Sequence, residues 1–218
     1  MKELGINQIQ CMPVYEFEEN DKYVNYWGYG PAFWFAPKSA YAASGNAEKE
    51  LKDLVKACHK EGIEVVLDMP FVSGLPHRMI EDCIRYYKME YHIDGFIINP
   101  FNAPAEELRR DPLLKNTKIL KKQDDFQNVM RRFLKGDEGM VRDVMWWQRH
   151  LSKEEGIFNY ITNHTGFTLQ DLVSYDGKHN EKNGEKNMDG PDYNYSWNCG
   201  AEGPSRKKAV TELRKNQV

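Results

Sequence analysis

The stretch that decides the fold is "HIDGFIINP", residues 92–100. It begins on an Asp-Gly turn, continues as a short apolar run and stops at Asn-Pro, which is typical of a buried strand. Catalytic side chains in α/β barrels stand at the carboxyl ends of such strands. Asn99 ends this strand, so the sequence raises the question whether a carboxylate is missing there.

Alternating helices and strands surround this stretch. The predicted helices are 47–62, 77–92, 105–114, 124–152 with an interruption near Gly136, and one from 206; the predicted strands are 6–14, 63–71, 94–100, 117–122 and 157–164. Such alternation favours a parallel sheet covered by helices. A doubly wound sheet and a (β/α)8 barrel fit it equally, although the missing Gly-rich dinucleotide loop weakens a doubly wound nucleotide binder.

The composition limits the classes of function. The chain has 218 residues, 40% of them hydrophobic, which predicts one domain with a sizeable core. Its net charge of -3 and the absence of a basic stripe argue against nucleic acid as a partner. No apolar run approaches the ~20 residues of a membrane span, and the amino-terminal segment lacks the apolar core of a signal peptide.

The four cysteines are scattered and show no C-x-x-C spacing. We therefore expect no metal site, no cofactor, and reduced thiols in a cytoplasmic protein.

A loop rich in aromatic residues follows the first predicted strand. Residues 23–41 contain Tyr23, Tyr26, Trp27, Tyr29, Phe33, Trp34, Phe35 and Tyr41. Aromatic rings bury the apolar faces of sugar rings and keep a polar edge, so the loop predicts carbohydrate binding. The alternative is that these rings pack together as a small core of their own.

Several ordered motifs resemble glycoside hydrolase family 13, in particular its glycogen-debranching, isoamylase and pullulanase branch. The motifs are "LGINQIQCMPV", "NYWGYGPAFWFAPKSAYA", "GIEVVLDMPF", "YHIDGF", "FLKGDEGM" and "NYITNHTGFTLQDLVSYDGKHNEKNGE". The resemblance covers nearly the whole chain and implies a TIM-type (β/α)8 barrel, here partial or compacted. It also implies cleavage of α-glucosidic bonds with retention, which needs a nucleophilic carboxylate and a carboxylic acid about 5–5.5 Å apart.

The resemblance implies that the catalytic residues are replaced. Ile97 occupies the position of an arginine, and Asn99 that of the nucleophile. Lys121 or Lys122 is nearest to the position of the acid, and Thr165 replaces the carboxylate that stabilises the distorted sugar. No catalytic carboxylate is therefore expected to be intact.

The resemblance to family 13 also implies that residues facing the substrate are retained. The set implied to bind sugar is Tyr26, Trp27, Tyr29, Asp68 and His164. Asp68 and His164 also have ordinary structural explanations, as a carboxylate accepting loop donors and as a polar residue at a strand end. Two further replacements, Val72 and Ser73, stand where the family usually has Asn and His.

The resemblance to family 13 implies one barrel domain over residues 1–218 that lacks the family's first and last strands and its inserted subdomain. The segment 176–205 is predicted to be a long polar loop. Open sheet edges would allow self-association or a partner chain.

Three functions remain open: a non-catalytic α-glucan-binding protein, an active α-1,6-glucan debranching hydrolase, and a decayed gene product. Two acidic residues nearest to the missing acid, Asp124 and Asp125, are predicted to cap a helix. Trp146 and Trp147 are predicted to pack in a core or interface.

Overall fold

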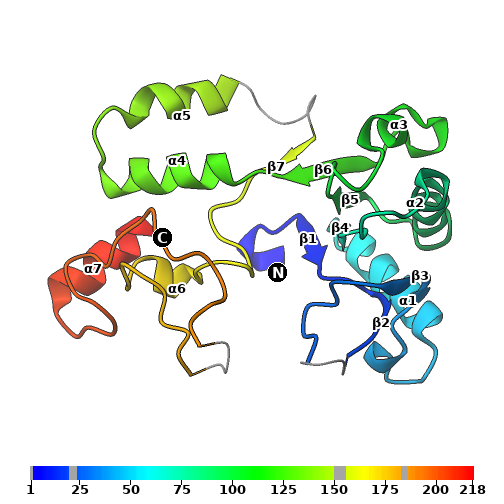
Figure 1. Cartoon of the computed structure of the whole chain (residues 1–218), viewed down its shortest axis with the longest axis horizontal. Coiled ribbons are helices and arrows are strands. Elements are labelled where there is room, and N and C mark those ends of the chain that lie inside the picture. The colour runs from blue at the N-terminus through cyan, green and yellow to red at the C-terminus, as the bar shows by residue number, and fades with distance from the viewer. Residues whose placement is uncertain (1, 20–23, 150–155, 183–185) are drawn as a thin grey trace. The chain divides into compact units, whose positions relative to one another are not determined.

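The computed structural model describes residues 2–19, 24–149, 156–182 and 186–218 (Figure 1). The chain forms two compact units, Met1–Lys122 with Glu155–Phe158, and Gln123–Glu154 with Asn159–Val218. Tyr23 of the aromatic loop and residues 150–152 of a predicted helix lie outside the described residues.

A five-stranded parallel sheet forms the centre of the first unit, in the order β1-β4-β5-β6-β7. Its strands are β1 Gln8–Cys11, β4 Glu64–Met69, β5 Gly95–Ile98, β6 Lys118–Lys122 and β7 Ile157–Phe158. The helices between them are α1 Ala47–Lys60, α2 His77–Tyr91 and α3 Ala105–Arg110, with short 3-10 turns at Lys2–Leu4, Ser39–Tyr41 and Pro112–Leu114. The predicted α/β class, with a parallel sheet and outer helices, is confirmed.

The core of this unit lies between one face of the sheet and the helices. Alternate residues of β4 and β5 point into it, together with the inner faces of α1 and α2. Its buried members include Val65, Leu67, Met69, Phe96, Ile98, Leu51, Val55, Ile80, Ile84 and Tyr87. The helical spacing of these side chains is what the sequence periodicity predicts.

An antiparallel hairpin, β2 Tyr15–Phe17 with β3 Ala32–Pro37, lies where the sequence predicts only a loop. Trp34 is buried between Tyr15 and Phe71, with ring centroids 4.6 and 4.8 Å away. One aromatic residue of the loop is thus part of the main core, which fixes the hairpin to the sheet.

A buried lysine ties the hairpin together. The Lys38 side chain is 3% exposed, and its Nζ lies 2.8 Å from Glu16 and 3.0 Å from Glu19. It also donates to the Phe17 carbonyl oxygen at 2.9 Å. Hydrogen bonds from Lys38, and then from Ser39, lower the pKa of Glu16 to about 2.

The second unit contains four helices within the described residues. They are α4 Asp124–Lys135, α5 Met140–Arg149, α6 Leu169–Leu172 and α7 Lys208–Gln217. Gly136 ends α4 in a left-handed conformation, φ 96°, which explains the predicted interruption. The predicted strand 157–164 shortens to β7, and beyond it the Tyr160 hydroxyl donates to Asp124 and the Thr162 hydroxyl to the Phe167 carbonyl.

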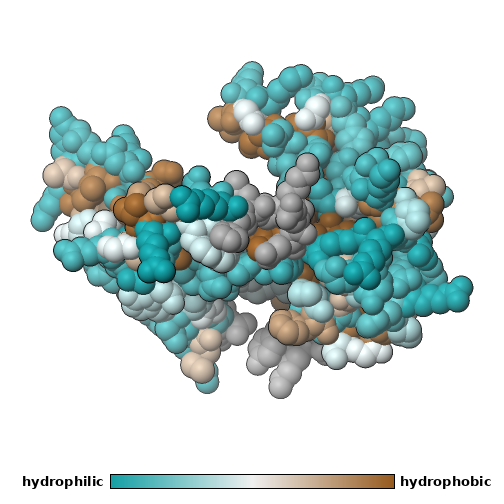
Figure 2. Space-filling model, turned by 90° about the horizontal axis from the view of Figure 1, so that it is seen from above, coloured by the Kyte–Doolittle hydropathy of each residue, from teal (hydrophilic) through white to brown (hydrophobic). Residues whose placement is uncertain are grey.

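The exposed side chains include large apolar ones, among them Tyr26, Phe33 and Phe101. Figure 2 shows a largely hydrophilic face on which apolar side chains form separate patches. In the part of the chain that the structure describes, no helix is long and apolar enough to cross a membrane.

Candidate functional site

Three predicted site residues of the first unit meet at the carboxyl edge of the sheet. Asp68 pairs in register with Ile97, and Ile97 with Leu120, so Lys122, two residues further, shares the face of Asp68. The Lys122 Nζ lies 2.8 Å from Asp68 Oδ2. The Tyr29 hydroxyl donates to the same oxygen at 3.0 Å.

The Lys122 ammonium and the Tyr29 hydroxyl together compensate the charge of the buried Asp68 carboxylate. Asp68 is only 3% exposed, and an unpaired charge at such a position would be strongly unfavourable. Burial, followed by the Asp68 charge, raises the pKa of Tyr29 above its ordinary value. The phenol therefore stays neutral at physiological pH and keeps the proton that it donates.

The side chain of Asn25 bridges the turn that carries Tyr29. Asn25 Oδ1 accepts the Gly28 N–H at 2.9 Å, and its Nδ2 donates to the Tyr29 carbonyl at 2.9 Å. Gly28 has φ 75°, and a Cβ there would lie 2.5 Å from the Phe17 ring, so only glycine fits. The Tyr15 hydroxyl donates to the Gly28 carbonyl at 3.2 Å, which anchors the turn on the core.

Two rings of this turn remain open to solvent. Tyr26 is 81% exposed and Trp27 is 46% exposed. The Trp27 and Tyr29 ring centroids are 6.1 Å apart, with an interplanar angle of 61°. Flat apolar surfaces beside a hydrogen-bonded phenol suit a ligand with apolar faces and hydroxyl edges.

Asn99, at the expected position of the nucleophile, stabilises a turn of the backbone. Asn99 is exposed, and its Oδ1 accepts the Phe101 N–H at 3.0 Å, closing a turn around Pro100. Ile97, at the expected arginine position, is buried and has no polar atom in its side chain. This strand end therefore supplies neither a carboxylate nor a cation.

His164 and Thr165 belong to the other compact unit. The Thr165 hydroxyl donates to Asn163 Oδ1 at 2.9 Å, and the Thr165 N–H donates to the same oxygen at 3.1 Å. His164 is half-buried. The structure thus brings Tyr29, Asp68 and Lys122 together, whereas His164 and Thr165 are placed only within their own unit.

The prediction for the acidic pair at the start of α4 was wrong in detail. Gln123, not an aspartate, is the N-cap residue, and it makes no side-chain capping bond. Asp124 instead accepts the Tyr160 hydroxyl. On α5, Trp147 is buried against Phe126, as expected for packing, while Trp146 stays half-exposed.

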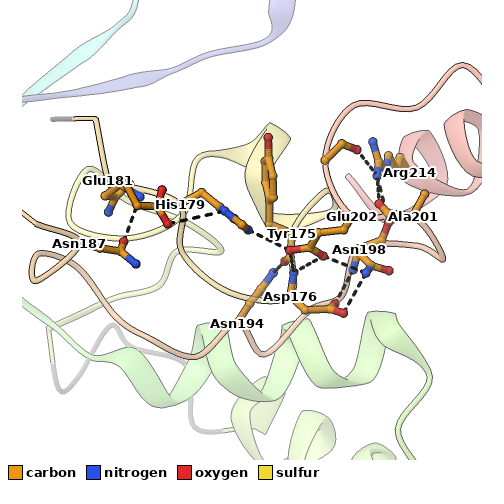
Figure 3. A network of polar contacts seen from close by, with 12 residues as sticks. Tyr175, Asp176, His179, Glu181, Asn187, Asn194, Asn198, Ala201, Glu202 and Arg214 are labelled. Atoms are coloured by element: carbon orange, nitrogen blue, oxygen red, sulfur yellow. Dashed lines mark hydrogen bonds and ion pairs between the residues drawn. The ribbon is translucent and has the colours of Figure 1, made fainter.

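A polar network organises the segment after α6, which the sequence predicts to be a long polar loop (Figure 3). Asp176 accepts the Asn198 N–H at 2.9 Å and the Asn198 side-chain amide at 2.8 Å. Glu202 lies 3.0 Å from His179 Nε2, and hydrogen bonds, first from Asn198, lower its pKa. The dense Asn and Asp content was the available signal, because these side chains hydrogen-bond nearby backbone.

Arg214 of α7 completes this network. The residue is 7% exposed, and its guanidinium donates to the carbonyl oxygens of Asn198 at 3.1 Å and Gly203 at 2.8 Å, and also to that of Ala201. Across the described residues, no three His, Cys, Asp or Glu side chains form a group that could hold a metal ion.

No family model matches the sequence. Isoamylase 3, chloroplastic, of Oryza sativa subsp. japonica is 31% identical over 320 residues, covering 99% of this chain and 41% of the relative. A glycogen operon protein GlgX homolog of Haemophilus influenzae is 30% identical over 310 residues, covering 100% of this chain and 47% of the relative. The chain thus spans less than half the length of these relatives.

Two solved structures have a similar fold. The pullulanase from Bacillus acidopullulyticus superposes with a TM-score of 0.58 at 22% identity, covering 78% of this chain and 33% of that one. The GBS pullulanase SAP, solved in complex with maltotetraose, gives a TM-score of 0.63 at 18% identity, covering 78% of this chain and 36% of that one.

Proposed function

Because this chain belongs to the isoamylase, glycogen-debranching and pullulanase branch of glycoside hydrolase family 13, we propose that it binds α-glucan without hydrolysing it. One observation carries the proposal: Lys122 lies 2.8 Å from Asp68 at the strand end nearest to the expected position of the acid. An ammonium paired with a buried carboxylate takes the place of a carboxylic acid.

The chemistry of retaining hydrolysis supports the loss of activity. It requires one carboxyl group to protonate the leaving oxygen and a second to trap the sugar. The Asn99 amide cannot form the glycosyl ester, and its oxygen is engaged with the Phe101 N–H. Asp68, a buried carboxylate at this edge, already accepts from Tyr29 and Lys122.

We expect no release of reducing sugar from glycogen or pullulan above a protein-free blank. The single variant Asn99→Asp is expected to stay inactive, because it restores one carboxylate and leaves Lys122 at the acid position. A reducing-end assay over hours measures both. Turnover by the unmodified chain would contradict the proposal and favour the alternative, an active α-1,6-glucan debranching hydrolase.

Binding is assigned to the turn formed by residues 25–29. Tyr26 and Trp27 offer exposed rings, and the Tyr29–Asp68 pair offers hydrogen-bonding edges beside them. His164 is proposed as a further sugar contact within its own unit. The maltotetraose bound by the GBS pullulanase SAP supports an α-glucan as the ligand.

Trp27→Ala is expected to weaken maltoheptaose binding about tenfold, since it removes an exposed ring of the size that contributes about 1–3 kcal/mol in a stacking contact. Isothermal titration calorimetry measures the affinity. Phe33→Ala is the matched control, because Phe33 is exposed on the hairpin but lies outside the turn. Equal affinities for the two variants, or no heat with the unmodified chain, would reject this binding site.

We also propose that residues 1–218 derive from one family-13 barrel domain in shortened form. The 320 aligned positions of the rice relative exceed the 218 residues of this chain, so the relative has segments without a counterpart here. A cytoplasmic location is part of the proposal, supported by four cysteines that are all unpaired.

A further inference from the structure

A cavity of about 130 Å³ lies within the second unit, between α6 and the polar segment that follows it. It is lined by two aromatic residues, one carboxylate residue, a lysine, a histidine, an asparagine, three glycines and a proline. The volume is several times the ~30 Å³ that one water molecule occupies in the liquid, so the cavity has room for a small molecule. Neither the aromatic turn nor Asp68 contributes to it.

The wall of the cavity is fixed by hydrogen bonds. Lys178 Nζ donates to the Asp189 carbonyl at 3.1 Å and lies 2.7 Å from Asp192 Oδ1. The Asn180 N–H donates to Asn187 Oδ1 at 2.9 Å. Figure 3 shows His179 held toward Glu202 on the same segment. A wall built in this way costs little further ordering when a ligand enters.

Polar groups of the lining are available to a ligand. The Asp171 carboxylate is half-buried and has no hydrogen-bond partner among the described residues. His179 uses Nε2 on Glu202, while its Nδ1 lies 4.0 Å from Glu181, beyond hydrogen-bond distance. The cavity therefore offers the Asp171 carboxylate as an acceptor, beside the rings of Phe167 and Tyr175.

The glycines leave room for a close-fitting ligand. Gly166, Gly177 and Gly190 line the cavity, and a Cβ at any of them would meet nothing nearer than 3.6 Å. Gly166 and Gly177 have no positive φ that would require glycine. The backbone at Gly166 and Gly177 therefore does not require glycine, and the absence of a side chain at these positions leaves space in the cavity.

We infer that this cavity binds one pyranose unit of an α-glucan, with Asp171 accepting from sugar hydroxyls and Phe167 or Tyr175 against the ring face. The inference rests on the proposed glucan-binding function and adds a second site to it. An anion is disfavoured, because Asp171 is acidic and the Lys178 charge is met by Asp192. A metal ion is disfavoured because the lining brings a single carboxylate residue.

The test uses methyl α-glucoside, which represents one sugar unit, with saturation-transfer NMR and titration of the whole chain. Asp171→Asn is expected to weaken binding at least about tenfold, because it removes a charged acceptor. Gly177→Ala, which adds a methyl group to the wall without a clash, is expected to weaken it as well. Asp143→Asn, an exposed carboxylate on α5 of the same unit, is the matched control and should bind like the unmodified chain.

The outcomes separate this site from the aromatic turn. Trp27→Ala should lower maltoheptaose affinity while leaving methyl α-glucoside binding unchanged. If Trp27→Ala abolishes methyl α-glucoside binding, or if Asp171→Asn and Gly177→Ala both bind normally, the inference is wrong. Loss of binding in Asp171→Asn together with normal binding in Trp27→Ala for both ligands would support this cavity and reject the aromatic turn. No signal with methyl α-glucoside overturns it.

Discussion

Replacing Lys38 with methionine is expected to lower the free energy of unfolding by about 2 kcal/mol, because it removes the buried charged donor of two partly exposed carboxylates and of a carbonyl oxygen. The Lys38 Nζ contacts Glu16, Glu19 and the Phe17 carbonyl, and the side chain is almost fully buried. Methionine fills the space but satisfies none of these oxygens. Urea unfolding followed by circular dichroism measures the change.

An exposed ion pair on α1 gives the matched control. Lys49 contacts Asp53, and both side chains are more than half exposed. Lys49→Met is therefore expected to change the unfolding free energy by less than about 1 kcal/mol. Equal losses for Lys38→Met and Lys49→Met would show that the hairpin does not depend on its buried lysine.

The same pair predicts a dependence on pH. The pKa of Glu16 is about 2 in the folded chain and 4.5 as its ordinary value. A carboxyl group with a lowered pKa contributes stability above its unfolded pKa and loses it as the pH falls toward the folded value. The stability difference between the unmodified chain and Lys38→Met should therefore be full at pH 7 and shrink between pH 4.5 and 2.

Arg214→Met is expected to cost about 3 kcal/mol in the second unit, because it leaves the carbonyl oxygens of Asn198, Ala201 and Gly203 without their charged donor. Hydrogen exchange of amides 198–203 should accelerate first. Lys208→Met is the control on the same helix, since Lys208 is 87% exposed. Unchanged exchange in Arg214→Met would mean that the segment is held by other contacts.

The repeating elements of the first unit were predictable, because the apolar spacing of α1, α2 and β4 reflects burial of one helical face or of a whole strand. The β2–β3 hairpin was not predictable, since its pairing depends on the burial of Trp34 against Tyr15 in the core and on the ion pair between Lys38 and Glu16. These are contacts between residues far apart in sequence, and no local period encodes them.

The site was predictable in part. The family resemblance singled out Asp68 and Lys121 or Lys122, but it did not predict the ion pair between Asp68 and Lys122, which forms across the uncharged Ile97. The hydrogen bonds that Asp176, Asn198 and Glu202 make within segment 176–205 were not predicted. Asn and Asp side chains that bind backbone groups give the same composition as a solvated loop.

Charge is distributed unequally between β1, at one border of the five-stranded sheet, and β6, which the two-residue strand β7 covers only in part. β7 pairs only with Lys121 and Lys122 of β6, and the sequence of β6 itself, "KILKK", is rich in lysine. β1, with the sequence "QIQC", carries no charged residue. Since lysines deter the docking of a foreign strand, any fibril-like growth from this molecule should begin along β1, and a lysine placed there would be the protective change.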